Sequence, residues 1–284
     1  MEFFWHLVAI IGMTLPNVLG FNLIFGKGKI FHFGPLGVST VATYATFVTL
    51  QVTGNWLLAI VVGLLGSLLI SALFAWLSFR LEPDGLGIMT IAMHLALLTV
   101  VLNWTGLTRG ALGIPKIPRL PYLEELAPFA LVVTLIAALW FALLCFLDRG
   151  PFGRALEALA EQEWYAEALG IDRVRVHLIA FLLGGVGALL TNLFYVQYVR
   201  LAHPNDLTFP FLIFLIMVVV AGKPGSMKGV LSSTILLVLL KEGLRFVPLP
   251  IAVLGPLRLI LFGIILLTAV YVRRDTLFPV QRTV

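Results

Sequence analysis

Charged residues and cysteines are both scarce in this chain of 284 residues. Only 12% of the residues are charged and 60% are apolar, whereas a soluble domain has roughly 25% charged and roughly 45–50% apolar residues. A soluble enzyme of this composition would expose large apolar patches, and a disordered chain would carry less apolar surface. The single Cys145 lies within an apolar run, which excludes a disulfide framework. We therefore expect an integral membrane protein.

Motifs for phosphate binding, metal binding and catalysis are also missing. The sequence has no GxxxxGK motif followed by Ser or Thr, and its glycine–lysine clusters at 26–29 and 222–225 have a different spacing. If ATP drives this protein, another chain must bind the ATP and its magnesium. The five histidines lack metal-ligand spacing, and no Ser/His/Asp or Cys/His set stands out. We expect no metal, no bound cofactor and no catalytic site in this chain.

Long apolar runs divide the whole sequence. A helix needs about 20 apolar residues to cross a hydrocarbon core about 30 Å thick, and these runs lack the alternation of membrane-barrel strands. We expect an all-α fold in one domain, residues 1–284, with about nine (eight to ten) transmembrane helices. The second run could be broken at Gly34-Pro35, and the seventh is short enough to be broken or re-entrant. The expected spans are 3–25, 34–52, 55–79, 85–102, 126–147, 177–199, 208–222, 229–247 and 256–272.

The scattered Lys and Arg residues predict the orientation of these spans. Because these residues stand singly between apolar runs, the net charge of +5 does not indicate a nucleic-acid partner. We expect the chain to be surrounded by a lipid bilayer. With nine spans, one side of the membrane collects twelve Lys and Arg residues and the other seven. The side with twelve should be cytoplasmic, which places the N-terminus outside and the C-terminus inside.

Two connections between the spans are long. The first, about 103–125, is expected outside, and its three prolines favour an extended or turned path over a long helix. The second, about 148–176, is expected in the cytoplasm. Its segment from Arg154 to Gly170 is rich in Ala, Leu and Glu, which predicts one short helix that stops at Gly170 in a positive-φ conformation.

Polar residues inside the spans are candidates for a translocation pathway, because burying them in a membrane is costly. Hydrogen bonding within or between helices is the alternative interpretation. No span carries the series of Asp, Glu or His residues that a proton relay requires. The candidate pathway residues are Asn17, Thr43, Tyr44, Thr90, His94 and Asn192.

The cytoplasmic helix predicted at 154–170 combines acidic and bulky apolar residues. A solvated loop does not require aromatic residues such as Trp164, whereas a helix that docks into a groove on another protein does. An interfacial helix on the bilayer is the alternative, but the acidic excess argues against contact with a negative inner leaflet. The candidate docking residues are Arg154, Glu157, Glu161, Trp164, Glu167, Ala168, Leu169 and Gly170.

Several short segments have a recognisable order and spacing. They are Gly34, 42–45, 102–104, 113–115, 153–156, 166–170, 180–181, 207–209, the glycine turn at 222–229, 258–263 and 277–279. Together they resemble the permease subunits of bacterial ABC importers for branched-chain amino acids, in which 153–156 and 166–170 match the coupling segment. The resemblance covers most of the chain from about Gly34. The chain departs from the family pattern at Pro35, at Leu95 and at Lys223, where many members carry His, Glu and Gly.

The resemblance implies an ATP-driven importer in a bacterial inner membrane. It implies a second permease subunit, identical or homologous, two cytoplasmic ATPase subunits that bind ATP and magnesium, and an external substrate-binding protein. The segment at 154–170 would couple ATP hydrolysis to movement of the spans. Branched-chain amino acids are the expected substrates, followed by other amino acids, short amides or urea. An ATP-independent secondary transporter or channel is the alternative class.

Overall fold

The computed structural model describes residues 1–246 and 251–272 of the chain. The matching motif at 277–279 and the arginines at 273, 274 and 282 lie outside the described residues. The elements are α1 (Glu2–Phe21), η1 (Asn22–Lys27), α2 (Gly34–Thr53), α3 (Trp56–Ser78), α4 (Pro83–Asn103), α5 (Thr105–Thr108), η2 (Gly110–Leu112), β1 (Ile114–Pro115), α6 (Leu126–Arg149), α7 (Pro151–Glu161), α8 (Glu163–Ala168), α9 (Arg173–Val199), β2 (Leu201–Ala202), η3 (Pro204–Leu207), α10 (Phe209–Ala221), α11 (Met227–Gly243), η4 (Leu244–Phe246) and α12 (Ile251–Val272).

The fold is a helix bundle, as the apolar runs predict, with one minute antiparallel pair, β1 and β2. Within the described residues, five helical segments are long and apolar enough to cross a membrane: α1 with η1, α3, α4, α6 and α9. The predicted count of nine spans is therefore not confirmed. Of the two alternatives left open at Gly34-Pro35, the structure has a helix start, because Pro35 occupies the first turn of α2, where its missing N–H is tolerated. The seventh run forms a helix of only 13 residues, α10.

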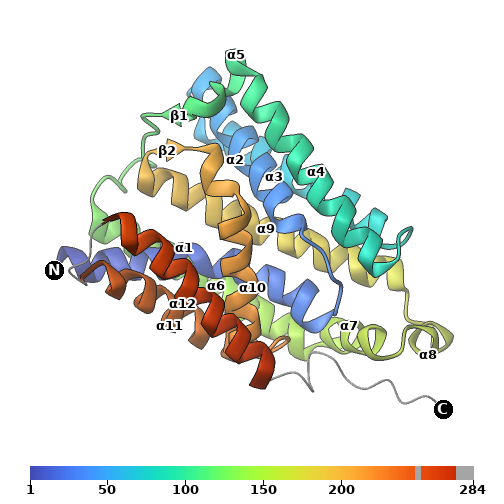
Figure 1. Ribbon diagram of the computed structural model, residues 1–284. Coiled ribbons are helices and arrows are strands. Elements are labelled where there is room, and N and C mark those ends of the chain that lie inside the picture. The colour runs from blue at the N-terminus through green and yellow to red at the C-terminus, as the bar shows by residue number, and fades with distance from the viewer. Residues whose placement is uncertain (247–250, 273–284) are drawn as a thin grey trace.

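Two helices, α1 and α9, contact each other at the centre of the bundle. Figure 1 shows α2, α3 and α4 to one side of α9, and α6 and α11 along α1, while α12 packs against α10. Small residues allow the two central helices to approach: a Cβ on Gly187 would lie 2.4 Å from the carbonyl oxygen of Pro16, and one on Gly20 would lie 3.0 Å from the Cα of Gly184. This close packing supports glycine as a helix-packing residue here.

The connections between the long helices gather at two opposite ends of the bundle. At one end, which we call the α7 end, Lys27 contacts Asp148, and Arg173 contacts the carbonyl of Ser78. At the other, the β1–β2 end, His6 contacts Glu242 and Tyr198. Lys27 and Arg173, of the set of twelve basic residues, lie at the α7 end, and Arg245, of the set of seven, lies at the β1–β2 end. The orientation of the chain in the membrane stays a prediction.

The predicted single helix at 154–170 is wrong in one respect, because the structure has two helices there. Gln162, with φ −151° and ψ 88°, separates α7 from α8. The break turns α8 back toward the bundle, where Ala166 is buried and Glu163 meets Arg173. These contacts override the strong helix propensity of the intervening sequence.

The long connection before α6 contains no long helix in the structure, as its prolines predict. It passes through α5, η2 and β1, and β1 pairs with β2 through Ile114 opposite Ala202. Gly113 makes this pairing possible, because it has φ +66° and a Cβ there would lie 2.4 Å from the carbonyl oxygen of Ala202. Gln197 of α9 also accepts a hydrogen bond from the backbone N–H of Leu120 at 2.9 Å. The connection is therefore fastened to the end of α9.

Candidate functional site: a protruding surface and a cavity

The helix pair α7 and α8 presents a bulky apolar surface to solvent. Trp164, Tyr165 and Leu169 are 85%, 72% and 84% exposed, while Leu156 and Leu159 are buried against the bundle. The break at Gln162 thus divides the apolar residues of this segment into an anchoring set on α7 and an exposed set on and after α8. All eight candidate docking residues are exposed: Arg154, Glu157, Glu161, Trp164, Glu167, Ala168, Leu169 and Gly170.

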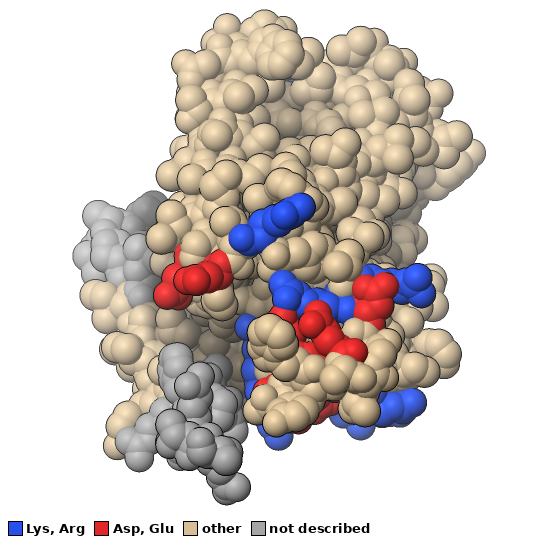
Figure 2. All heavy atoms as spheres, turned by 90° about the vertical axis from the view of Figure 1, so that its right-hand side faces the viewer, with Lys and Arg blue, Asp and Glu red and all other residues tan. Residues whose placement is uncertain are grey.

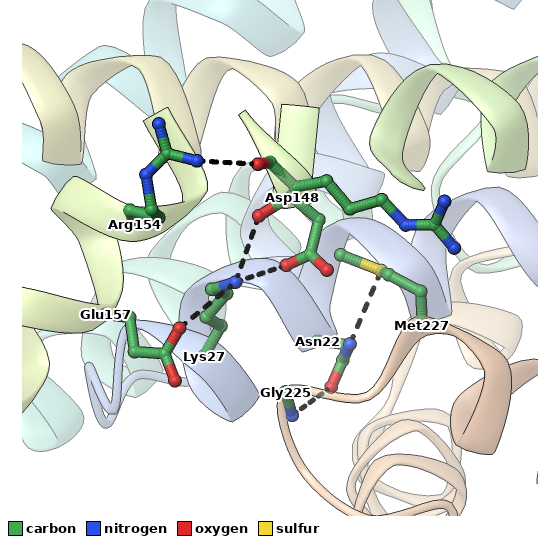
Figure 3. Close-up of polar contacts among 8 residues, drawn as sticks. Asn22, Lys27, Asp148, Arg154, Glu157, Gly225 and Met227 are labelled. Carbon is green, nitrogen blue, oxygen red and sulfur yellow. Dashed lines mark hydrogen bonds and ion pairs between the residues drawn. The ribbon is translucent and has the colours of Figure 1, made fainter. Parts of the chain in front are cut away.

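A lysine fastens α7 to the bundle. Lys27, at the end of η1, donates hydrogen bonds to the Asp148 carboxylate at 2.5 Å and to its backbone carbonyl at 3.2 Å, and lies 3.5 Å from Glu157 (Figure 3). Its side chain is only 11% exposed, so water screens this pair less than a surface pair. The corner between α6 and α7 requires Gly153, because a Cβ there would lie 1.9 Å from the carbonyl oxygen of Asp148. Lys27, 121 residues away from Asp148 in the sequence, therefore holds the start of α7 in place.

The second helix of the pair is fixed at both of its ends. Glu163 forms an ion pair with Arg173, at the start of α9. After α8, the N–H of Gly170 donates to the carbonyl of Glu167 at 2.9 Å and the N–H of Ile171 to that of Ala166 at 3.1 Å. With φ +87° at Gly170, this is a Schellman C-terminus. The predicted positive-φ stop at Gly170 is confirmed.

The two pairs of glutamates at spacing four now have a structural explanation. In each pair, one member meets a cation, Glu157 with Lys27 and Glu163 with Arg173, and the other, Glu161 or Glu167, is exposed. Figure 2 shows acidic and basic side chains gathered around this end of the molecule, while much of the same face carries neither. The exposed surface is therefore apolar at its tip and is flanked by charges of both signs.

At the β1–β2 end, a cavity of about 540 Å³ lies among α1, α2, α9, η3, α10, α11 and α12. Its size falls in the range of small-molecule sites, about 300–1,000 Å³. Apolar side chains such as Met13, Phe214 and Val238 line it together with Asp206 and Lys241. Burial raises the pKa of the Asp206 carboxyl above its ordinary value, against the opposing charges of His203 and Lys241.

The cavity includes two of the six candidate pathway residues, Thr43 and Asn192. Asn17 lines a second, much smaller cavity of about 20 Å³ instead. The other three lie outside both cavities. All six are buried: Asn17, Thr43, Tyr44, Thr90, His94 and Asn192.

Internal hydrogen bonds account for some of the polar candidates. Thr90 Oγ1 donates to the carbonyl of Leu86 at 2.9 Å and accepts from the N–H of Phe33 at 3.0 Å, and Asn192 donates to the carbonyl of Ala188 at 2.7 Å. Asn17 donates to Ser39 at 3.3 Å. These contacts support the helix-bonding interpretation for Thr90. In contrast, the side chains of Thr43, Tyr44 and His94 each have an atom with no hydrogen-bond partner among the described residues.

Sequence reasoning missed an ionic cluster on the wall of the large cavity. Glu242, buried at the end of α11, lies 3.1 Å from His6 Nε2 and accepts a hydrogen bond from Arg245 at 2.9 Å, while His6 Nδ1 contacts the hydroxyl of Tyr198. The sequence does indicate that His6, Tyr198 and Glu242 each lie near the outer end of an expected span. That these three side chains contact one another follows only from the arrangement of α1, α9 and α11 in space. Among the described residues, no group of three or more His, Cys, Asp or Glu side chains could hold a metal ion.

The two features that stand out are the exposed helix pair at one end of the bundle and the cavity at the other. The chain belongs to the family of permease components of branched-chain amino acid transport systems, because the family profile matches residues 4–270. Members of this family are membrane transport subunits, not enzymes, and the predicted resemblance is confirmed.

Curated relatives agree with this assignment. The chain is 27% identical over 272 residues to the high-affinity branched-chain amino acid transport permease LivM of Salmonella typhimurium. The aligned region covers 84% of this chain and 63% of that protein. It is 28% identical to a probable LivM of Methanocaldococcus jannaschii, over 80% of this chain and 69% of the relative. It is also 21% identical to LivH of Salmonella typhimurium, and the aligned region covers 68% of this chain and 71% of LivH. The chain thus spans about 63% of the length of the Salmonella LivM that it matches.

Proposed function

We propose that this chain is one transmembrane subunit of an ATP-driven importer in a bacterial inner membrane. A second permease subunit, two cytoplasmic ATPases that bind ATP and magnesium, and an external binding protein complete the complex. Relatives named LivM and LivH, both matched by this chain, support a homologous partner permease. Their printed function, branched-chain amino acid transport, supports amino acids with apolar side chains as the substrates.

The exposed surface of α7 and α8 carries this proposal. Trp164, Tyr165 and Leu169 form an apolar tip on a helix pair that Lys27 and Arg173 fasten to the bundle. A groove on an ATPase would bury these three side chains, and closure of the ATPase pair would push the helix pair as a rigid unit. Because α7 joins α6 and α8 leads into α9, the movement would reach the central helices directly. The α7 end is then cytoplasmic and the N-terminus external.

The pathway would pass through the large cavity at the β1–β2 end. Thr43 and Asn192 line that cavity, so we propose them as pathway residues. Asn17, Tyr44, Thr90 and His94 remain proposals that rest on their burial. Tyr44 and His94 have in addition a polar atom without a hydrogen-bond partner among the described residues, and Asn17 lines the small cavity. Thr90 is the weakest, because its hydroxyl is satisfied.

Loss of the apolar tip tests the coupling role. In the reconstituted complex, Trp164→Ala should weaken the ATPase contact by about 2 kcal/mol, because truncated interface tryptophans commonly cost that much. Glu167→Lys and Gly170→Val should also abolish transport and stimulated ATP hydrolysis, the first by reversing an edge charge and the second because Val does not tolerate φ +87°. ATPase activity is measured with and without the loaded binding protein.

The matched control is Trp104→Ala, because Trp104 is also exposed, at 58%, but lies at the end of α4 near β1. It should retain wild-type stimulation. Wild-type stimulation in all three variants of the α7 end would remove that surface from the coupling mechanism.

One observation favours the alternative class, an ATP-independent secondary transporter. The buried Glu242, paired with His6 and Arg245, is an ionisable group on the cavity wall. If proteoliposomes that contain only the permease subunits accumulate substrate under an imposed proton gradient without ATP, this alternative replaces the importer. Uptake that depends strictly on ATP supports the importer.

A further inference from the structure

The small cavity of about 20 Å³ lies where the two central helices meet α2 and α3. A cavity needs roughly 10–15 Å³ to hold one water molecule, so this cavity has room for a ligand of about that size. Most of its lining is apolar, but the side chains of His32, Ser71 and Asn17 also line it. His32 is only 3% exposed and Ser71 only 1%, so bulk water does not reach them. Their polar atoms must therefore find partners inside the protein.

The backbone determines which nitrogen of His32 carries the proton. His32 lies in the connection between η1 and α2, where the N–H of Gly34 donates a hydrogen bond to its Nδ1 at 3.1 Å. Burial lowers the pKa of His32 to about 3, so the ring is neutral at neutral pH and its single proton lies on Nε2. This Nε2 is buried and has no hydrogen-bond partner among the described residues. His32 therefore has an N–H donor available to a ligand.

The hydroxyl of Ser71 differs from that of its neighbour Ser67 on α3. Ser67 Oγ donates to the carbonyl of Leu64 at 2.9 Å, which is the usual way for a helix to satisfy a serine. Ser71 Oγ has no partner within the part of the chain that the structure describes, although it is buried as well. Because an unmade hydrogen bond at a buried hydroxyl is costly, a ligand that reaches Ser71 would stabilise the fold.

Helix α9 sets the separation of these two groups. The centres of the His32 and Phe181 rings are 4.9 Å apart, and a Cβ on Gly185 would lie 2.4 Å from Ser71 Oγ. Phe181 and Gly185 are four residues apart on one face of α9, which separates them by about 6 Å along the helix axis. One water molecule with two hydrogen bonds of about 2.8 Å spans a gap of about 5–6 Å.

We propose that the small cavity binds one water molecule, which accepts a hydrogen bond from His32 Nε2–H and donates one to Ser71 Oγ. The water joins the segment before α2 to α3 and so holds these two helices together near the α7 end. Asn17, on the same wall, offers a third polar side chain. The small cavity shares no lining residue with the large one, and the site needs neither a substrate nor a partner subunit. Its test is therefore independent of the proposed transport function.

The chemistry of the two groups favours water over an ion. A cation needs lone pairs from its ligands, whereas His32 presents an N–H. An anion would need a positive charge to offset its loss of hydration, and none of the described residues that line the cavity is Lys or Arg. Water both accepts and donates hydrogen bonds, so a single molecule satisfies the N–H and the hydroxyl together.

Solid-state NMR of the full chain in lipid bilayers, with isotope-labelled histidine, tests the site directly. We expect a neutral His32 ring with its proton on Nε2 and a through-space signal between that proton and a bound water. Because the chain has five histidines, the His32→Gln variant assigns the resonance as the one that disappears. A proton on Nδ1, or an Nε2–H without contact to water, would overturn the proposal.

Removing the second partner of the water tests the bridge. Ser71→Ala should at least halve the signal between water and His32 and should lower the midpoint of thermal unfolding in detergent. The matched control is Ser67→Ala, because Ser67 lies one turn away on the same helix, is equally buried, and is satisfied by Leu64. This control should leave the signal unchanged and lower the midpoint less. Equal effects of the two variants, on the signal or on the midpoint, would contradict the bridge.

A change of salt distinguishes water from a halide ion, which could also accept from an N–H and an O–H. Replacing chloride in the buffer by bromide or by gluconate should leave the His32 signal and the unfolding midpoint of the wild type unchanged. A His32 signal that depends on the halide would identify an anion as the ligand and overturn the proposal.

Discussion

At the scale of single residues, Lys223 has a backbone conformation that favours glycine, with φ +73°. The resemblance to the permease family leads us to expect Gly at this position. The left-handed region costs a residue with a side chain about 1–2 kcal/mol, because Cβ approaches the following carbonyl oxygen. The turn nevertheless forms, since Asn22 accepts a hydrogen bond from the N–H of Gly225 at 2.9 Å (Figure 3). The Ser226 side chain also caps α11 by accepting from the N–H of Gly229 at 3.1 Å.

Replacing that lysine should stabilise the protein. Lys223→Gly removes the steric cost at φ +73°. Because Gly also gives the unfolded chain more conformational freedom, the net gain in the free energy of unfolding should be about 0.5–1 kcal/mol. Lys228→Gly is the control, because Lys228 lies inside α11 and Gly there should be destabilising. The measurement is the midpoint of thermal unfolding in detergent. Equal shifts in the two variants would contradict the strain at residue 223.

At the scale of elements, the orientation of α7 depends on contacts between segments distant in sequence. Lys27→Met leaves the Asp148 carboxylate, with its side chain only 22% exposed, without its closest cation. We expect a loss of about 1–3 kcal/mol in stability and a loss of ATPase stimulation, because α7 is no longer fastened to η1. Thermal unfolding and ATPase assays measure the two effects.

The control for this ion pair is another one at the same end. Arg175 and Asp172 are 3.8 Å apart but largely exposed, so Arg175→Met should cost at most about 1 kcal/mol and leave coupling intact. If the Lys27 variant behaved like the Arg175 variant, α7 would be held by its buried leucines alone.

At the scale of the whole molecule, the orientation in the membrane is a prediction from the twelve-to-seven distribution of Lys and Arg. The orientation can be measured by introducing single cysteines into a Cys145→Ala background and labelling them with a membrane-impermeant thiol reagent from each side. Glu161→Cys, on α7, should be labelled from the cytoplasm, and Tyr122→Cys, 97% exposed in the connection before α6, from outside. Gly113 is unsuitable as a label site, because a Cβ there meets the carbonyl oxygen of Ala202. Labelling of both cysteines from one side would contradict the assignment.

The sequence by itself determined the features that depend on local composition and on the order of motifs along the chain. Apolar runs identified the helices, Gly170 marked the end of a helix, and the order of motifs identified the family. The count of spans was less secure, because α10 is short and polar residues interrupt α2, so length and composition do not decide whether these helices cross the membrane.

Only the tertiary structure decided which side chains meet. The contact of Lys27 with Asp148 and the cavity that joins Thr43 to Asp206 involve segments far apart in the sequence. The break at Gln162 accompanies contacts that α8 makes with the bundle. Periodicity places a residue on a helix, but the rotation and contacts of that helix follow from packing against its neighbours. This is why sequence alone grouped six buried polar residues as one pathway, while packing placed only Thr43 and Asn192 on the same large cavity.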